Sequence, residues 1–312
     1  MPTSDIILHH YDASPFSQKV RELLAIKKLG WHSVITPNMM PKNDLVPLTG
    51  GYRRAPVMQI GADIFCDSQV IMAEIERRTP GADIGLSWPV NLWADRPFFL
   101  ITVTLIFGKL GNSVDSAFIA DREKLSGRPF DVAAMAAAAG PARGHWRAQA
   151  AWIERALTLG RTPFLAGETP GIADVSAHMN IWFLADNFPA EADELLGGFA
   201  ALATWRAAMR GLGEGAPQPM TGARALEIAA ASQPMPVPIV HEGADLCGFD
   251  IGDSVVVAAD DYGRDPIAGS VVAISADRII IARQTPDLGL LHLHFPRASF
   301  VVAARPAPGD QP

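Results

Sequence analysis

The first eighty residues alternate short apolar runs with stretches whose apolar positions recur at helical spacing. Residues 5–10 (DIILHH) and 31–36 (WHSVIT) have the length and side-chain content of strands. Between them, Ser14-Pro15 supplies an N-cap and a first-turn proline, and the apolar side chains that follow fall on one helical face. Two strands joined through one helix predict a βαβ unit with parallel strands.

A second group of elements follows at 56–80. Residues 56–60 and 63–66 are apolar runs separated by Gly61-Ala62, which predicts a tight hairpin. Asp67-Ser68 then begins a helix that ends before Pro80, because Asp and Ser favour helix starts and proline cannot continue a helix. The predicted order is therefore β-α-β followed by β-β-α.

In the rest of the chain the composition and the periodicity of apolar residues change twice. Residues 88–232 are rich in Ala and helical in period, and within them 97–107 (PFFLITVTLIF) predicts a buried helix too short to span a bilayer. Residues 237–305 are rich in Val, Ile and turn residues and predict five or six short strands. We therefore expect an α+β multidomain chain, with an α/β domain at 1–80, an all-helical bundle at 88–232 and a small all-β, SH3-like barrel at 237–305.

Composition narrows the classes of function. The 312 residues are 49% apolar and 19% charged, which excludes a disordered chain. The net charge of −7 and the acidic pair Asp260-Asp261 argue against nucleic acid as a partner. Two cysteines cannot form a disulfide framework, and no secretory signal or membrane span is evident, so we expect a cytoplasmic protein. His292 and His294 share a strand face, but no cysteine or acidic cluster accompanies them, and we expect no metal.

The order of elements, with Ser-Pro-Phe at 14–16 and Ala-Pro-Val at 55–57, resembles the thioredoxin-like domain of the glutathione transferases. FLAGETPGIADVSAH at 164–178 is similar to the turn into the central helix of that family's second domain. The resemblance covers about residues 1–225 and leaves 237–305 outside it. It implies an enzyme that uses glutathione as cosubstrate, a homodimer, and an apolar electrophile as the second substrate.

Ser14 is the candidate catalytic residue. Glutathione conjugation needs a thiolate, and a free thiol with a pKa of about 8.5 is only slightly ionised at pH 7. A helix start offers unpaired N–H groups and partial positive charge, and a hydroxyl beside it can donate one further hydrogen bond to the sulfur. In family members with Ser-Pro-Phe the serine holds the sulfur, so the resemblance implies this role for Ser14, with Ser17 as a second candidate. The alternative is that Ser14 only caps the helix.

The resemblance also implies a set of glutathione-binding residues. At this helix start the Ser68 hydroxyl and the N–H groups suit the carboxylate of the γ-glutamyl end, and Asp67 suits its ammonium, although both residues are also ordinary capping residues. Ala55 would present its backbone before a cis Pro56. The candidates for the glycyl carboxylate are basic side chains that could equally be solvated surface charges, namely Lys42, Arg53 and Arg54.

The electrophile pocket is expected on the helix after residue 88, where Trp93, Phe98, Phe99 and Phe107 could line it or simply pack in the core. The predicted function is conjugation of glutathione to an apolar electrophile. Two alternatives stay open. One is a non-catalytic glutathione-binding scaffold whose β region binds a partner, and the other is a glutathione-dependent isomerase or dehalogenase.

Overall fold

The computed structural model describes residues 6–81, 85–237 and 247–305. Its first part has the predicted thioredoxin-like order, in which β1 pairs parallel with β2 and antiparallel with β3, and β3 pairs antiparallel with β4. A short helix, α2, is added before the hairpin. The elements are β1 (Ile7–His10), α1 (Pro15–Ile26), β2 (His32–Ile35), α2 (Val46–Thr49), β3 (Val57–Ile60), β4 (Asp63–Cys66) and α3 (Ser68–Arg78).

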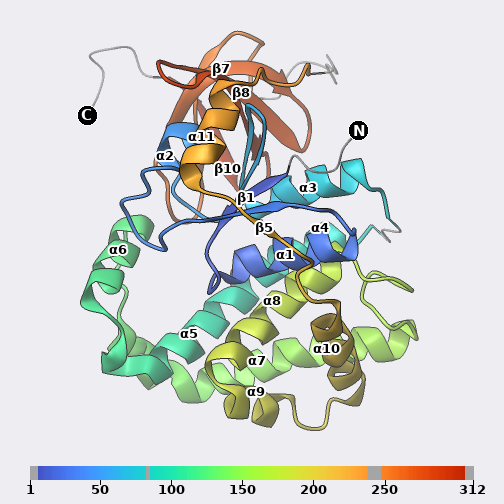
Figure 1. Ribbon diagram of the computed structural model, residues 1–312. Helices are drawn as coiled ribbons and strands as arrows, with labels where there is room; N and C mark the ends of the chain where they lie inside the picture. The colour runs from blue at the N-terminus through green and yellow to red at the C-terminus, as the bar shows by residue number, and fades with distance from the viewer. Residues whose placement is uncertain (1–5, 82–84, 238–246, 306–312) are drawn as a thin grey trace.

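The helical part lies below this sheet in Figure 1, as the sequence predicts. Its elements are α4 (Ser87–Trp93), η2 (Ala94–Phe98), α5 (Phe99–Leu110), η3 (Gly111–Ser113), α6 (Ser116–Ser126), α7 (Val132–Gly160), α8 (Ile172–Asn187), α9 (Pro189–Leu196) and α10 (Ala200–Leu212). The chain then returns to the sheet through β5 (Gln218–Pro219), which pairs with β2, and α11 (Gly222–Ala230).

The apolar run at 97–107 belongs to a longer helix than the sequence predicts. Elements α4, η2, α5 and η3 are continuous from Ser87 to Ser113, and this 27-residue helix is long and apolar enough to cross a membrane by length and composition. A third of its most apolar window is buried, and α5 packs along α7. Leu92 and Leu100 are exposed on its outer side. The prediction of a short buried helix was therefore wrong about its length and about its outer face.

The last strands extend the sheet of the first domain. They are β6 (Ser254–Ala259), β7 (Ile267–Ile274), β8 (Arg278–Thr285), β9 (Gly289–Pro296) and β10 (Phe300–Ala304), and we call them the appended strands. Strand β9 pairs parallel with β4, so all the described strands make one sheet in the order β10-β6-β7-β8-β9-β4-β3-β1-β2-β5. Among the described residues β10 pairs only with β6, and no ladder closes a barrel. A strand predicted at 238–241 lies outside the described residues.

The physical reason for the joined sheet is the edge of the first hairpin. Without β9, strand β4 would present unpaired backbone N–H and C=O groups along an apolar edge. The register places Ile64 opposite Leu293, and both side chains are fully buried. Five of the predicted strands are thus present and complete the sheet of the first domain, and the SH3-like barrel stays a prediction.

The sheet separates two apolar cores. Leu8 and Phe65 face α1, α3 and the helical bundle in one core, which also holds Trp146 and Trp205. Val57 and Ile64 face the other way. They pack with α2 and with side chains of the appended strands, which include Val255, Val257, Ile279, Leu291, Leu293 and Phe295. The first domain therefore depends on both neighbours to bury its two faces.

A histidine of β9, His294, contributes a side-chain contact to the pairing of β9 with β4. Asp63 Oδ1 lies 2.8 Å from His294 Nε2, and Asp63 Oδ2 accepts a hydrogen bond of 2.7 Å from the backbone N–H of Met235. Burial lowers the pKa of His294, and the neighbouring carboxylate of Asp63 opposes that shift. No cluster of metal-ligating side chains occurs within the described ranges.

We predict that Leu293→Ala lowers the free energy of unfolding by about 2–5 kcal/mol, because it opens a cavity in the shared core. Hydrogen exchange should become faster in residues 57–66 as well as in 289–296. Val301→Ala is the control, since Val301 lies on β10 and is 55% exposed, and it should change stability by less than about 0.5 kcal/mol. Faster exchange confined to 289–296 would contradict the shared core.

Two buried histidines make stability depend on pH. His9 and His10 end β1, and burial lowers the pKa of each from 6.5 to about 4. The amide nitrogen of Gln59 donates to two backbone carbonyls, so its Oε1 accepts from His9 Nε2–H at 3.0 Å. His9 is therefore held neutral in the folded protein.

Between pH 6.5 and 4 the unfolded chain binds more protons at these histidines than the folded chain does, so stability falls as the pH is lowered. At pH 5 the cost from His9 is about 2 kcal/mol. His9→Gln keeps an amide donor and removes the titrating group. We expect urea unfolding of this variant to lose less stability than wild type between pH 7 and pH 5. Parallel pH profiles would show that His9 does not carry the effect.

Candidate functional site

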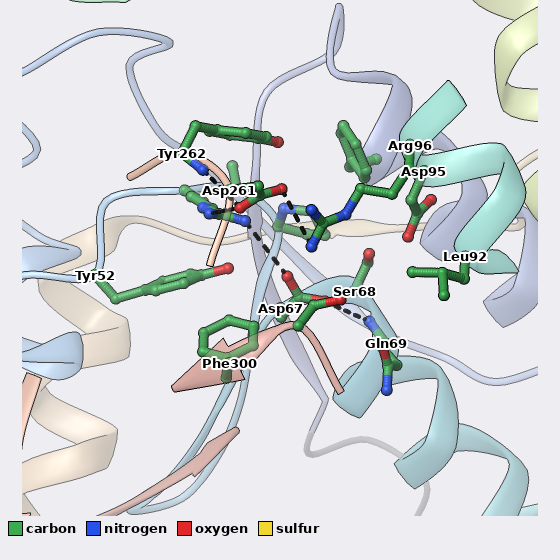
Figure 2. A pocket seen from close by; sticks show the side chains of 15 residues that line it. Tyr52, Asp67, Ser68, Gln69, Leu92, Asp95, Arg96, Asp261, Tyr262 and Phe300 are labelled. Carbon is green, nitrogen blue, oxygen red and sulfur yellow. Dashed lines mark hydrogen bonds and ion pairs between the residues drawn. The ribbon is translucent and has the colours of Figure 1, made fainter. Parts of the chain in front are cut away.

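A cavity that is partly open to solvent lies where the first domain, the helix of α4–η2 and the appended strands meet (Figure 2). It is lined by Phe16, Tyr52, Arg54, Ala55, Pro56, Asp67, Ser68 and Gln69 of the first domain, by Leu92, Asp95 and Arg96, and by Asp261, Tyr262, Ser299 and Phe300. The cavity thus brings together five of the predicted site residues, namely Arg54, Ala55, Pro56, Asp67 and Ser68. Its other lining residues come from the first domain, the helix and the appended strands.

The start of α3 forms one wall of the cavity. Asp67 has the positive φ of 100°, uncommon for a residue with a side chain, and its Oδ1 accepts a hydrogen bond of 2.9 Å from Gln69 N–H. Ser68 is only 3% exposed, and within the described part of the chain its hydroxyl has no hydrogen-bond partner. The Ala55–Pro56 peptide beside it is cis, as the resemblance implied. This wall therefore offers backbone groups and a free hydroxyl to a ligand.

Arg54 is the central charge of the cavity. Its guanidinium bonds Asp261, lies 3.9 Å from Asp67 and stacks at 4.0 Å over the Tyr262 ring. Its Nε is buried and has no hydrogen-bond partner among the described residues. Arg96 extends the charge pattern through a contact of 2.5 Å to Asp260. Positive and negative groups therefore alternate around the opening.

Asp95 reaches the cavity from η2 and also joins two domains. Its Oδ1 lies 2.6 Å from Lys19 Nζ on α1, a fully buried ammonium that also donates to Asn91. Burial raises the pKa of Asp95, although the ammonium of Lys19 favours the charged form. Because Lys19 balances this carboxylate, the pair holds the helical bundle against the first domain.

Two tyrosines supply neutral hydroxyls. Burial raises the pKa of Tyr52 and of Tyr262 above the ordinary value of 10, and Asp67 adds to the shift at both. Both side chains therefore stay protonated at neutral pH, and within the described residues neither hydroxyl has a hydrogen-bond partner. Figure 2 shows the Tyr52 hydroxyl directed towards the centre of the site.

Ser14 occupies the predicted N-cap of α1 but does not line this cavity. It is 1% exposed, and its Oγ accepts a hydrogen bond of 3.1 Å from Ser17 N–H. The Ser17 hydroxyl is buried without a partner among the described residues. Phe16 of the same segment does reach the cavity. The capping role of Ser14 is therefore evident, and its role toward a thiol stays a prediction.

The candidates for the glycyl carboxylate lie in two places. Arg54 is in the cavity, whereas Lys42 is 4% exposed and its Nζ lies 5.8 Å from the centre of the Tyr11 ring. Burial and then Arg122 lower the pKa of Lys42 to about 8. Arg53 forms an ion pair of 3.5 Å with Asp121 of α6. Lys42 and Arg53 thus belong to a neighbouring basic cluster beside α6.

The aromatic residues predicted to line the electrophile pocket lie in different places. Trp93 stacks on Phe98 at 4.9 Å, and Phe98 is fully buried in the helical core. Phe99 packs edge-on against Phe16 at 4.7 Å, which links it to the cavity wall. Phe107 packs with Phe118 and Phe130, the latter at 5.0 Å. Of these side chains, Phe99 is the one that contacts a lining residue.

Sequence reasoning missed the lining residues that come from outside the first domain. Asp261 and Tyr262 follow an appended strand, and the acidic pair at 260–261 was interpreted only as evidence against nucleic acid. Asp95 and Arg96 lie in a helix for which the sequence pattern predicts only aromatic residues as lining of a pocket. Nothing in the local spacing of Asp261 and Tyr262 indicates the site, because the pairing of β4 with β9 brings the appended strands to it.

The comparisons agree with this architecture. Residues 8–83 match the family Glutathione S-transferase, N-terminal domain. A crystal structure of a GST-like protein from Pseudomonas syringae is 30% identical, with a TM-score of 0.77, and covers 98% of this chain and 100% of its own. No curated protein matches the chain.

Two plant structures share the fold more distantly. A Tau class glutathione S-transferase from mango, Mangifera indica, is 15% identical with a TM-score of 0.52, and covers 68% of this chain and 90% of its own. Poplar glutathione transferase F1 is 17% identical with a TM-score of 0.50, and covers 72% and 97%. The likeness to the bacterial protein extends over the appended strands, because it covers nearly the whole of both chains.

Proposed function

The chain belongs to the glutathione S-transferase-like proteins, and we propose that it binds glutathione in the cavity of Figure 2 and conjugates its thiol to an apolar electrophile. The observation that carries the binding proposal is the hydroxyl of Ser68, a residue only 3% exposed at the start of α3, which lines the cavity and has no hydrogen-bond partner among the described residues. A carboxylate placed there would accept from that hydroxyl and from helix-start N–H groups.

The rest of the cavity suits the same ligand. The γ-glutamyl end of glutathione is an α-amino acid with one carboxylate and one ammonium, and the cavity has both arginines and aspartates at its rim. The backbone of Ala55, before the cis Pro56, would pair with the cysteinyl unit. Lys42 or Arg53, from the neighbouring basic cluster beside α6, would hold the glycyl carboxylate where the ligand extends beyond the cavity. Phe99 together with Phe16 would offer apolar surface to the electrophile.

The conjugation step needs the sulfur as an anion. We assign its stabilisation to the start of α1, with Ser14 as hydroxyl donor, because the N-cap geometry leaves the hydroxyl proton of Ser14 free to donate while its oxygen accepts from Ser17 N–H. Holding thiolate and electrophile together would supply the remaining acceleration. The proposed transfer to an apolar electrophile therefore depends on this role of Ser14.

A glutathione-binding scaffold without turnover is the second candidate. It is favoured by one observation, that Ser14 is buried and does not line the cavity. We also propose a homodimer, since Trp88 and Leu100 expose apolar surface on α4 and α5 that a second copy would cover. A cytoplasmic location fits the two free cysteines, Cys66 and Cys247.

We expect Ser68→Ala to weaken glutathione binding by about tenfold or more, because a hydrogen bond to a charged group is lost. Asp115-Ser116 at the start of α6 is a matched control. There Asp115 caps the helix by accepting from Ala117 N–H at 2.7 Å, as Asp67 does for α3, and Ser116 is exposed. Ser116→Ala should bind glutathione like wild type in calorimetric titration. Equal affinities for all three proteins would refute a carboxylate at Ser68.

Ser14→Ala separates the enzyme from the scaffold. We expect the ultraviolet band of bound thiolate to disappear near neutral pH and conjugation to fall, while glutathione affinity changes little. The lost cap costs about 1 kcal/mol of stability by itself. Thr221→Ala removes a comparable cap on α11, where Thr221 accepts from Arg224 N–H at 3.2 Å, and should leave the band intact. Saturable glutathione binding with no thiolate band in wild type would favour the scaffold.

A further inference from the structure

We propose that Asp261, from the appended strands, recognises the α-ammonium of the glutamyl end of the ligand, so that the amino-acid subsite is completed by a region outside the first two domains. This inference rests on glutathione binding in the cavity. It assigns a specificity residue to the loop at residues 260–263, which joins β6 to β7 and which we call the 260–263 loop.

The 260–263 loop is fixed at three points around the cavity. Asp261 bonds Arg54 of the first domain, and Asp260 contacts Arg96 of η2 at 2.5 Å. Gly263 N–H donates to the backbone carbonyl of Leu125 on α6 at 2.5 Å. Gly263 has a φ of 57°, and a Cβ there would approach Arg54 Nε and Leu125 Cδ1 to 3.0 Å. The close approach and the backbone both favour glycine, so the loop is positioned with little freedom.

One oxygen of Asp261 is already used and the other is not. Oδ1 accepts from Arg54 and from Tyr262 N–H. Among the described residues, the one cation close to Oδ2 is Arg96, which forms an ion pair at 3.7 Å, beyond hydrogen-bond distance. The side chain is 21% exposed and lines the cavity, as Figure 2 shows. An ammonium entering the cavity therefore meets an unsatisfied carboxylate oxygen.

The remaining charges leave a complementary place for an α-amino acid. Lys19 balances Asp95. Among the described lining residues this leaves two arginines, Arg54 and Arg96, facing two carboxylates, Asp67 and Asp261. A ligand that carries one ammonium and one carboxylate preserves this balance, whereas a ligand with only the carboxylate disturbs it. The unpartnered hydroxyl of Ser68, a residue only 3% exposed, lies in the same cavity and would take the carboxylate.

The test compares two ligands. One is glutathione, and the other is its analogue without the α-amino group, glutaryl-cysteinyl-glycine. We expect wild type to prefer glutathione by about tenfold or more, as for a close charge pair. Asp261→Asn should lose most of that preference by weakening glutathione binding while leaving affinity for the analogue nearly unchanged. Calorimetric titration of full-length protein measures both affinities.

Two variants guard against a merely structural effect. Asp260→Asn loosens the anchor of the loop to Arg96 but keeps the Asp261 carboxylate, so it should retain the preference for glutathione. Asp265→Asn changes an exposed residue of the same connection and should behave as wild type. Thermal unfolding of each variant checks that the loop change has not unfolded the protein.

The outcomes separate this inference from the function beneath it. If wild type binds glutathione but Asp261→Asn weakens both ligands equally, or keeps the preference, the role of Asp261 is overturned and the glutathione site stands. If wild type shows no preference for the amino group, the inference fails in the same way. If wild type does not bind glutathione at all, the proposed function itself is refuted.

Discussion

The parallel pairing of β4 with β9 is the interaction on which the rest of the molecule depends. It satisfies the backbone groups along the edge of the first hairpin and buries Ile64 and Leu293 on one shared face. Because β9 is held there, the other appended strands continue the sheet outward (Figure 1). The 260–263 loop between β6 and β7 then lies at the cavity. A chain lacking this pairing would leave both the edge and the second core open to water.

Buried polar pairs fix the other side of the site. Lys19 and Asp95 join α1 to η2, and Glu22 and His178 join α1 to α8 at 2.8 Å. A buried charge is costly when single, so Lys19 and Asp95 each require the other to be in place. These pairs position η2, and with it Arg96, relative to the start of α3. The walls of the cavity are therefore set by contacts between domains more than by any one domain.

Arg54 shows how closely the parts depend on one another. A buried guanidinium needs carboxylates around it, and among its described residues the first domain supplies Asp67, at 3.9 Å. Asp261 supplies the shorter contact and Tyr262 the stacked ring. The appended strands thus balance a charge of the first domain, which gives a physical reason for a loop of this region to remain over the site. The same contacts place an additional carboxylate where a zwitterionic ligand would sit.

By itself the sequence determined the elements whose signals are local. The helix starts at Ser14-Pro15 and Asp67-Ser68, the hairpin at 56–66 and the βαβ order follow from capping, periodicity and turn chemistry, and all are present. The placement of Ser68 and Arg54 beside the cis Pro56 also followed from these motifs through the family resemblance. These features depend on residues near one another in the chain.

Only the tertiary structure decided where the last seventy residues go. Alternating Val and Ile at 254–304 indicate strands, but a strand pattern does not say which edge it pairs with, and the hydrogen-bonding groups of a closed barrel and of a joined sheet are the same. The burial of Ser14, the separation of Lys42 from Arg54 and the arrival of Asp261 at the cavity are likewise long-range. These arrangements arise because the edge of β4 and the two apolar faces of the sheet must be covered at the same time, and no local sequence pattern encodes that requirement.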